Sequence, residues 1–538
     1  MDSKRLEDCM LCGAASKEFA LESQICPTSN NHFCPCGELE QLEGQIRDFL
    51  HSALKKRQEL RLRVNHFHNQ NFHQTPPEVV SYIFLFYVSS VQLEQPVGPP
   101  RWCRPTKHRL SGPLVLGAVC RKWREIAWST PRLWSSITIS LSPKSFSSQL
   151  PVAREWLGRS GQLPLSISIV MRRRYLHSMA DNLLPMIHLL NKYAGRWHHL
   201  ECYAIPRDLL SAFKINLNDQ GLQASTLRIA NIEPADGWVD TPPIVQGFSP
   251  IVVELSGVPF PSIGISWSRV TRVHALEFSV DECIELFRQA PLLTDCTFLD
   301  VESDQQEYPL PNGNITHTGL NSLRLQLGDS VMSTFLCHLS FPSLLELHLQ
   351  VQADGINDAP LTDKFVSFFK RSPLLKTLKL LGPIIKHDSE LVRVLSTTPA
   401  LTHLYISRYV STSLTLHHLF TRLAESWLVE DDPCRASEQF LPKLQCLHFS
   451  GHSPNPWDDL SKAFGPISEI TNPRRRPFNQ LQFESLDYEA DRDNEHSANM
   501  MKLVPLKDAG IDLKIMDPDY DNKDLLEEYL SSTPQNTP

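Results

Sequence analysis

A short pattern, apolar-x-x-Leu-x-apolar, recurs through residues 197–488 and constrains the fold more than any other feature. Its last two apolar positions are two residues apart, the period of a strand that buries one face. Instances start at Trp197, Ala224, Val273, Leu293, Leu320, Leu344, Leu375, Leu401, Leu444 and Phe483, with a degenerate one at Val252. Because one such unit cannot bury its own apolar face, we expect neighbouring units to stack and share a core.

The segments between these strands carry helix patterns. Residues 281–290 have an acidic first turn and a cation in the last turn, which suits the helix dipole, and residues 362–371 and 389–395 are similar. Successive instances of the strand pattern, from the one at Leu293 to the one at Leu401, start 27, 24, 31 and 26 residues apart. This alternation resembles an irregular leucine-rich repeat with long units. The resemblance implies an α/β solenoid with insertions over residues 136–516.

The polar positions of the predicted strands are expected on the concave face of that solenoid, where stacked repeats offer a binding surface. These positions include Asn321, Ser322, Arg324, Gln326, Glu346, His348, Lys376, Thr377, Lys379, Thr402, His403 and Tyr405.

Two amphipathic helix patterns precede the repeats. The first opens at Pro76 and Pro77, where a missing amide costs little. Its shared face carries Val79, Val80, Ile83, Phe84, Tyr87 and Val88. The second pattern is read as one helix ended by Pro131. Its apolar residues at the i, i+3, i+4, i+7 spacing are Leu116, Val119, Cys120, Trp123, Ile126 and Ala127.

Together these residues resemble the F-box. The matching positions are Pro76-Pro77-Glu78, Ile83-Phe84 and the run 119–127, Val-Cys-Arg-Lys-Trp-Arg-Glu-Ile-Ala. The continuation over residues 129–134 resembles the version common in mushroom-forming fungi. The resemblance covers residues 74–135, with a long proline-bearing loop at 89–112. The expected fold class is therefore α+β, a small helical F-box followed by an irregular leucine-rich-repeat solenoid.

The F-box resemblance implies a function. Such a chain is the substrate-recognition subunit of a Skp–cullin–F-box ubiquitin ligase, and its repeats bind an unidentified substrate protein. The F-box would bind a Skp-type adaptor and, through it, a cullin. The positions that match the adaptor-binding motif are Pro76, Pro77, Val79, Ile83, Phe84, Leu116, Val119, Trp123 and Ile126. Several of them are equally suited to the core of a small helical domain.

The sequence leaves one other functional class open and argues against a second. Thr75, where the family usually has leucine, and the long 89–112 loop motivate an interaction scaffold that acts outside any ligase. An enzyme is not expected, because the sequence has no glycine-rich phosphate loop, no His-Glu-x-x-His pattern and no Gly-x-Ser-x-Gly pattern. We therefore predict no catalytic residue, no cofactor and no metal site.

The amino-terminal part of the sequence leaves two questions open. Residues 38–70 form a heptad pattern, interpreted either as a helix folded onto its neighbours or as a weak, self-associating coiled coil. The seam residues are Leu39, Leu42, Ile46, Phe49, Ala53, Leu60 and Phe67, interrupted by Lys56 and Arg63. Residues 1–37 are expected to be a flexible segment. Its cysteines are Cys9, Cys12, Cys26, Cys34 and Cys36, and we assign them no metal although Cys9 and Cys12 have zinc-site spacing.

Composition limits the classes of partner that the chain is expected to bind. A net charge of −8 argues against a general nucleic-acid binder, and the longest apolar run is too short to cross a membrane. The polar start, residues 1–8, predicts no secretory signal, so we expect reduced cysteines and a cytoplasmic or nuclear location, or both. Residues 517–538 are acidic and polar and are expected to be a disordered tail.

Overall fold

The computed structural model describes most of the chain in two compact units, residues 1–80 and 81–538. The described residues are 35–68, 75–93, 112–141, 146–171, 180–214, 225–230, 243–303, 305–352, 361–385, 387–408, 416–429, 439–451, 457–485, 495–517 and 523–532. Predictions about residues 1–34, including four of the amino-terminal cysteines, lie outside these ranges. Helix α1 (Cys36–His68) replaces the helix predicted over 38–70, with small shifts at both ends.

Strands in the described part of the second unit form a single long sheet whose strand order follows the chain. All neighbours are parallel except the last pair, β16 and β17, and the small strands β8 (Ile315–Thr316) and β10 (Leu339–Ser340) pair separately. The sheet strands are β1 Ser136–Leu141, β2 Leu165–Met171, β3 Trp197–Tyr203, β4 Thr226–Ala230, β5 Val252–Ser256, β6 Arg272–Leu276, β7 Asp295–Val301, β9 Ser322–Gly328, β11 Glu346–Gln352, β12 Thr377–Leu381, β13 His403–Arg408, β14 Cys446–Gly451, β15 Gln480–Ser485, β16 Asp512–Asp517 and β17 Lys523–Asp524.

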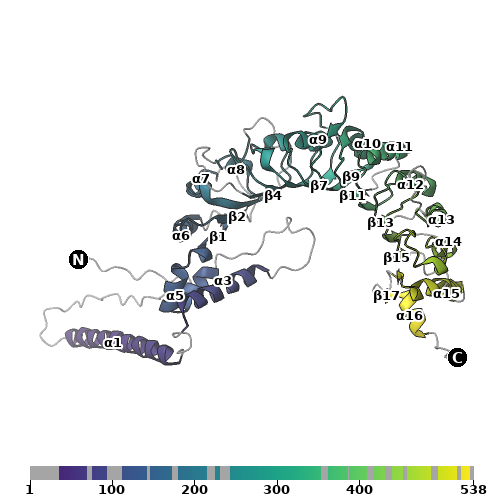
Figure 1. Ribbon diagram of the computed structural model, residues 1–538. Helices are drawn as coiled ribbons and strands as arrows, with labels where there is room; N and C mark the ends of the chain where they lie inside the picture. The colour runs from purple at the N-terminus through teal and green to yellow at the C-terminus, as the bar shows by residue number, and fades with distance from the viewer. Residues whose placement is uncertain are drawn as a thin grey trace. The chain divides into compact units, whose positions relative to one another are not determined.

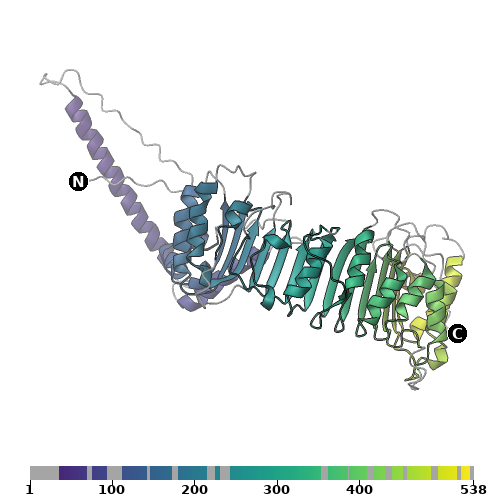
Figure 2. The same cartoon turned by 90° about the horizontal axis from the view of Figure 1, so that it is seen from above.

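Helices cover one side of this sheet. Within the second unit the sheet curves, with the strands on its inner side and the helices on its outer side (Figure 1), and the strands follow one another in a row (Figure 2). The covering helices are α6 Phe146–Arg159, α7 Ala180–Asn191, α8 Arg207–Leu210, α9 Val280–Gln289, α10 Asp329–His338, α11 Thr362–Lys370, α12 Asp388–Leu395, α13 His417–Glu425, α14 Trp457–Lys462, α15 Glu495–Asp508 and α16 Leu525–Ser532. Mixed helix and strand content with a long parallel sheet agrees with the expected α+β class.

Two rows of buried apolar side chains run across the sheet in register. One row contains Leu323, Leu347, Leu378 and Leu404, and the other starts two residues further along each strand. Every strand of the long sheet from β1 to β16, which excludes β8 and β10, contributes one residue to each row, and all these side chains are buried. Because alternate strand residues face opposite sides, these rows fill the space between sheet and helices and leave the residues between them on the inner face.

The register corrects the sequence pattern at three places. Strand β6 buries Val273 and Ala275 rather than Leu276, so the instance placed at Val273 is three residues too late. Strand β5 likewise aligns Val253 and Leu255, so the degenerate instance at Val252 is misplaced. The instance placed at Phe483 is also wrong, because Phe483 itself lies in the second buried row. The small side chain of Ala275 made the true strand look less apolar than the residues after it.

The helix predicted through Cys120 is in fact two helices, α4 (Gly112–Val119) and α5 (Arg121–Trp128). Cys120 has an extended backbone, with φ −157° and ψ 171°, and its Sγ accepts a hydrogen bond from the Trp123 amide at 3.4 Å. The side chain of Arg124 donates to the Gly117 carbonyl at 2.8 Å, which satisfies an acceptor at the end of α4. Apolar periodicity continues across this break, so the sequence pattern does not reveal it.

The first predicted helix is longer than expected. Helix α3 (Pro77–Leu93) continues into the segment assigned to the 89–112 loop, and residues 94–111 lie outside the described ranges. Val80 and Phe84, which are four residues apart on α3, are buried, and the Phe84 ring lies 4.9 Å from that of Trp123 on α5.

Trp134 joins the helices that precede the sheet to the sheet itself. It ends a short 3-10 helix (Pro131–Trp134), is buried, and donates from Nε1 to the Ala127 carbonyl at 2.7 Å. Its ring packs edge-to-face on Trp156 of α6 at 4.9 Å. The guanidinium of Arg159 lies 4.2 Å from the Trp128 ring and 4.9 Å from the Trp134 ring. These contacts attach α5 directly to the first strand–helix unit.

The carboxyl-terminal prediction is wrong for residues 523–532. Strand β17 pairs with β16, and helix α16 follows it. The Asp524 carboxylate accepts from the Leu526 amide at 3.1 Å, as an N-terminal cap does, and Leu526 is buried. The acidic composition of this segment predicts disorder, but it does not account for the burial of Leu526 or for the cap formed by Asp524.

Trp134→Ala should lower the free energy of unfolding by about 3–5 kcal/mol, because it empties a buried indole site and removes a hydrogen bond. Chemical denaturation of the full chain measures this. Trp128→Ala, which truncates a more exposed indole beside the same arginine, serves as the control and should cost about 1 kcal/mol or less. Equal losses in the two variants would contradict the role assigned to Trp134.

Candidate protein-binding surfaces

Helix α3 carries an apolar stripe that faces solvent. Val79, Tyr82, Ile83 and Phe86 follow the i, i+3, i+4, i+7 spacing, and each is exposed, Phe86 by 76%. The opposite side of the helix carries the buried Val80 and Phe84. A helix that is apolar on both sides needs two apolar neighbours, and the described residues supply only one of them.

Helices α4 and α5 repeat this two-sided character. Val115 and Val119 are exposed on α4, whereas Leu116 between them is buried. On α5, Ile126 and Ala127 are buried and Trp128 is partly exposed. Exposed apolar side chains concentrated on consecutive helices are typical of a protein–protein interface.

The structure divides the residues predicted to bind an adaptor. Pro76, Pro77, Val79, Ile83 and Val119 are exposed. Trp123 is half-buried, with its ring against Phe84. Phe84, Leu116 and Ile126 are buried and belong to the core. Only the exposed group is free to contact another protein directly.

Sequence reasoning missed Tyr82, Phe86 and Val115 as exposed apolar residues. For α3 the sequence does contain the information, because Tyr82 and Phe86 share the helical spacing of Val79 and Ile83. The sequence pattern predicts one broad apolar face, but in the structure these residues and the pair Val80–Phe84 lie on different sides of the helix.

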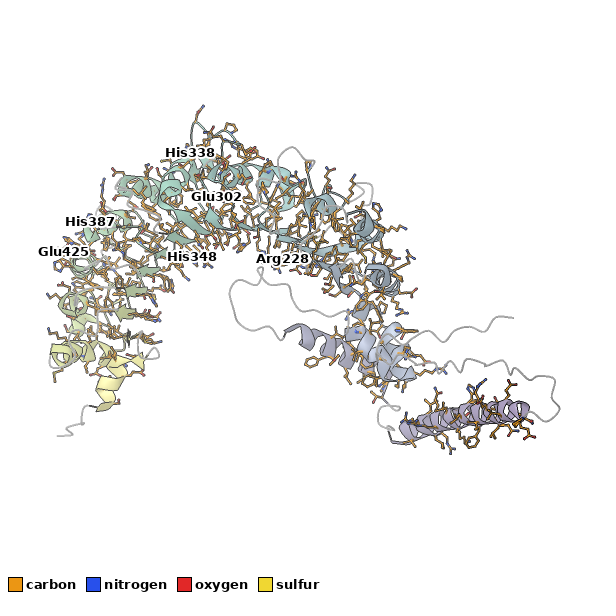
Figure 3. The ribbon with its side chains drawn as sticks, turned by 180° about the vertical axis from the view of Figure 1, so that it is seen from behind. Arg228, Glu302, His338, His348, His387 and Glu425 are labelled. Atoms are coloured by element: carbon orange, nitrogen blue, oxygen red, sulfur yellow. The ribbon has the colours of Figure 1, made fainter. Side chains whose placement is uncertain are left out.

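A second candidate surface follows the inner face of the sheet. Between the two buried rows lies a row of side chains in direct register, here called the middle row. Its members from β3 to β15 are Glu201, Arg228, Glu254, His274, Thr297, Arg324, His348, Lys379, Tyr405, His448 and Gln482. Figure 3 shows the labelled Arg228 and His348 on the inner side and His338, His387 and Glu425 on the helix side.

The first part of the middle row is an ion-paired cluster. Arg228 Nε donates to Glu254 at 2.6 Å, and its Nη1 lies 3.3 Å from Glu201. All three side chains are about a quarter exposed. Because the guanidinium on β4 binds a carboxylate on each neighbouring strand, it helps to hold β3, β4 and β5 in register, and the cluster keeps one carboxylate more than it has cations.

The central part of the middle row is basic and aromatic. Arg324, His348 and Lys379 lie on the successive strands β9, β11 and β12. The Lys379 ammonium lies 4.8 Å from the centroid of the Tyr405 ring, whose centroid is 5.8 Å from that of His448. No described carboxylate forms a salt bridge with Arg324 or Lys379. This stretch, here called the basic–aromatic stretch, therefore offers positive charge to a partner.

The electrostatic effect of the two cations is visible at His348. Partial burial, followed by the charges of Lys379 and Arg324, lowers the pKa of His348 to about 4. The imidazole is thus neutral at pH 7, because burial and, to a smaller extent, the two neighbouring positive charges disfavour its protonated form. Burial also lowers the pKa of His448 and of His274 in the same row.

The polar positions predicted for the concave face are found where expected. Arg324, His348, Lys379 and Tyr405 lie in the middle row, and Ser322, Glu346, Thr377 and His403 lie in the row two residues earlier. Gln326 lies two residues later and donates to Asp300 at 2.7 Å. The three remaining positions, Asn321, Lys376 and Thr402, come just before the strands that carry these rows. Their backbone carbonyls accept hydrogen bonds from amides at or just before the start of the next strand, as the Lys376 carbonyl does from the Thr402 amide.

The described ranges hold no group of three or more histidine, cysteine or acidic side chains arranged to bind a metal ion. Within the same ranges, no helix has both the length and the apolar content required to cross a bilayer.

None of the known family models matches the chain, and no curated protein matches it. Among solved structures, a crystal structure of a Bacteroides fragilis protein from a structural-genomics programme aligns with 65% of this chain and 74% of its own length. Identity is 13% and the TM-score is 0.24, which is too low to support any argument about fold or function.

His348→Gln should change how stability depends on pH. The unfolded histidine takes up a proton near pH 6.5, but the folded one does so only near pH 4. The contribution of the neutral His348 side chain to the free energy of unfolding is therefore fully present above pH 6.5 and is lost as the pH falls towards 4. After allowance for solvent screening, the loss should be about 1–2 kcal/mol and absent from the variant. If the difference in unfolding free energy between wild type and variant stays constant from pH 4 to pH 7, this prediction is wrong.

Proposed function

We propose that the chain is the substrate-recognition subunit of a Skp–cullin–F-box ubiquitin ligase, acting in the cytoplasm, the nucleus or both. In this proposal α3, α4 and α5 form the F-box and bind a Skp-type adaptor, which contacts a cullin. The strand–helix array acts as a leucine-rich-repeat solenoid that holds a substrate protein. The chain itself performs no catalysis, needs no cofactor, and raises the rate of modification by bringing substrate and ligase together.

The observation that carries the proposal is the exposure of apolar side chains at F-box positions. Ile83 and Val119, both matches to the family motif, are 49% and 56% exposed. Exposed valine, isoleucine and phenylalanine on consecutive helices favour a permanent partner over a free surface, because an obligate interface resembles a divided protein core. An adaptor is the partner that the F-box resemblance implies.

The contacts of Trp134 support a role as spacer. They pack α5 against the first strand–helix unit, so an adaptor bound to these helices would be held in a fixed relation to the start of the sheet. A fixed separation between adaptor and substrate is what a ligase subunit requires for efficient transfer.

The basic–aromatic stretch suggests the chemistry of the substrate segment. Arg324 and Lys379 supply positive charge without a salt-bridged carboxylate among the described residues, and Tyr405 and His448 offer flat rings. Such a surface favours an acidic or phosphorylated segment that lies across the strands. We include this preference in the proposed function.

Changing both Ile83 and Val119 to lysine should reduce binding of a Skp-type adaptor at least about thirtyfold, because charged groups replace two apolar contacts. Co-purification of the full chain with adaptor and cullin measures the loss. The matched control changes Leu292 and Leu374, 55% and 51% exposed outside these helices, to lysine and should bind as the wild type does. All variants should keep their circular dichroism spectra.

The outcomes separate the functional classes. Adaptor and cullin captured together, and lost in the Ile83/Val119 variant alone, support the ligase subunit. Adaptor without cullin supports the scaffold outside a ligase. If the wild type captures neither protein, the F-box proposal is wrong, and the inner face of the sheet becomes the main candidate surface.

Changing Arg324 and Lys379 to glutamate should weaken binding of an unstructured glutamate-rich peptide at least about tenfold, because the variant repels the probe. Fluorescence anisotropy at low and high salt measures the affinity. The control changes the exposed Arg269 and Lys443 to glutamate and so alters net charge equally. Equal weakening in both variants, or no binding by the wild type, would contradict an acidic ligand.

A further inference from the structure

Helix α1 exposes a long apolar seam along one side. Leu39, Leu42, Ile46 and Phe49 follow steps of three and four residues, and Ala53 and Lys56 continue these steps to Leu60. The five large apolar side chains are each about half exposed or more, with Phe49 at 73%. A single helix gains little stability from its own hydrogen bonds in water and depends on packing of its apolar side. At about 1.5 Å per residue, this seam is long enough for several turns of contact with a second helix.

Charge is divided between the two halves of α1. The amino-terminal half is acidic, with Arg47 as an exception, and the carboxyl-terminal half is basic, with Glu59 as an exception. The acidic residues are Glu38, Glu40, Glu43 and Asp48, and the basic residues are Lys55, Lys56, Arg57, Arg61 and Arg63. A helix with this distribution complements a copy of itself that runs in the opposite direction.

Parallel pairing of two copies is unfavourable. It would place Lys56 against Lys56 and Arg63 against Arg63 within the seam, and Glu38 beside Glu43 of the other helix along its flank. The two seam pairs bring like charges together where the helices exclude water, and the two glutamates repel each other beside the seam, which disfavours this arrangement.

Antiparallel pairing removes these conflicts. With the two-fold axis midway between Phe49 and Ala53, Phe49 packs against Ala53 of the second copy and Leu42 packs against Leu60. The large phenylalanine ring thus meets the smallest seam residue. The same register places Glu43 opposite Arg57 on the flank of the seam, once on each side of the axis.

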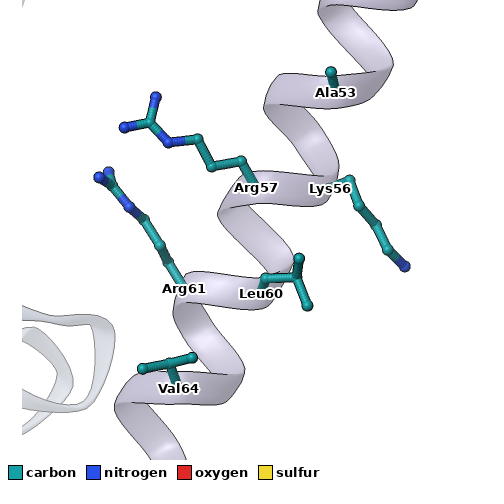
Figure 4. Close-up of a pocket in the computed structure, with 6 residues that line it drawn as sticks. All are labelled: Ala53, Lys56, Arg57, Leu60, Arg61 and Val64. Atoms are coloured by element: carbon teal, nitrogen blue, oxygen red, sulfur yellow. The ribbon is translucent and has the colours of Figure 1, made fainter.

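The surface of α1 fits this register. An open hollow beside Leu60 has Arg57 and Arg61 on one side and Lys56 on the other, with Ala53 and Val64 at its ends (Figure 4). The opposing segment would carry Leu42, Ile46 and Phe49 into the hollow, with Glu43 near the arginines. The hollow therefore has both the apolar floor and the basic rim that the acidic half of a second copy requires.

We propose that the chain forms a homodimer through an antiparallel coiled coil of two α1 helices. The inference is independent of the proposed ligase function, since it concerns only α1. A dimer would carry two copies of every other binding surface of the chain, so that a ligand with two binding segments gains avidity.

The test measures the mass of the full chain by light scattering across a dilution series. Glu43→Arg alone and Arg57→Glu alone should each weaken dimerisation about five- to tenfold, because two like-charged pairs replace two opposite ones. The double variant with both changes should restore the wild-type value. Residues 43 and 57 lie too far apart to interact within one helix, so this rescue requires antiparallel pairing.

Phe49→Asp should abolish the dimer, and Gln58→Asp, on the opposite side of α1, should leave it intact. A wild type that stays at the 61.2 kDa monomer mass over the series would overturn the proposal. So would a dimer that resists Phe49→Asp, or single charge variants that the double variant does not rescue. A Phe49→Asp protein that loses monomer stability at unchanged mass would show that α1 packs on its own chain, which also overturns the proposal.

Discussion

The two rows of buried apolar side chains between sheet and helices are the constraint on which the second unit depends. Each strand of the long sheet from β1 to β16 supplies one residue to each row, and the parallel register keeps the rows straight from strand to strand. A shift of one residue would turn a strand's apolar side chains to the inner face and expose its polar ones to the core. The register of the buried rows therefore also fixes the positions of Arg324, His348 and Lys379 on the opposite face.

Two surfaces of different chemistry follow from this frame. The helices before the sheet expose apolar side chains such as Ile83 and Val119, suited to a long-lived partner, whereas the inner face exposes charge and aromatic rings, suited to a polar segment. The contacts of Trp134 with Ala127 and Trp156 connect α5 to the start of the sheet. The receptor function proposed above would use both surfaces and the connection through Trp134 between them.

The sequence predicted the alternation of strand and helix, the polar positions of the inner face and a helix over residues 38–70, which the structure places at Cys36–His68, because each depends on local periodicity. It misplaced strands β5, β6 and β15, where a small residue such as Ala275 or a nearby apolar run competed with the true register. The break at Cys120 was missed because apolar spacing continues through it. Which of the positions that resemble the F-box motif are exposed depends on packing around Phe84 and Leu116, and no single-sequence pattern contains that information.

Hydrogen–deuterium exchange of the full chain, alone and with a Skp-type adaptor, most directly tests the proposal that α3, α4 and α5 bind the adaptor. We expect slower exchange with adaptor in the peptides that cover α3, α4 and α5, and unchanged exchange in the strands of the inner face from β7 to β14. Protection confined to the inner-face strands, or no protection in the three helices at saturating adaptor, would contradict the claim that these helices are the adaptor-binding surface.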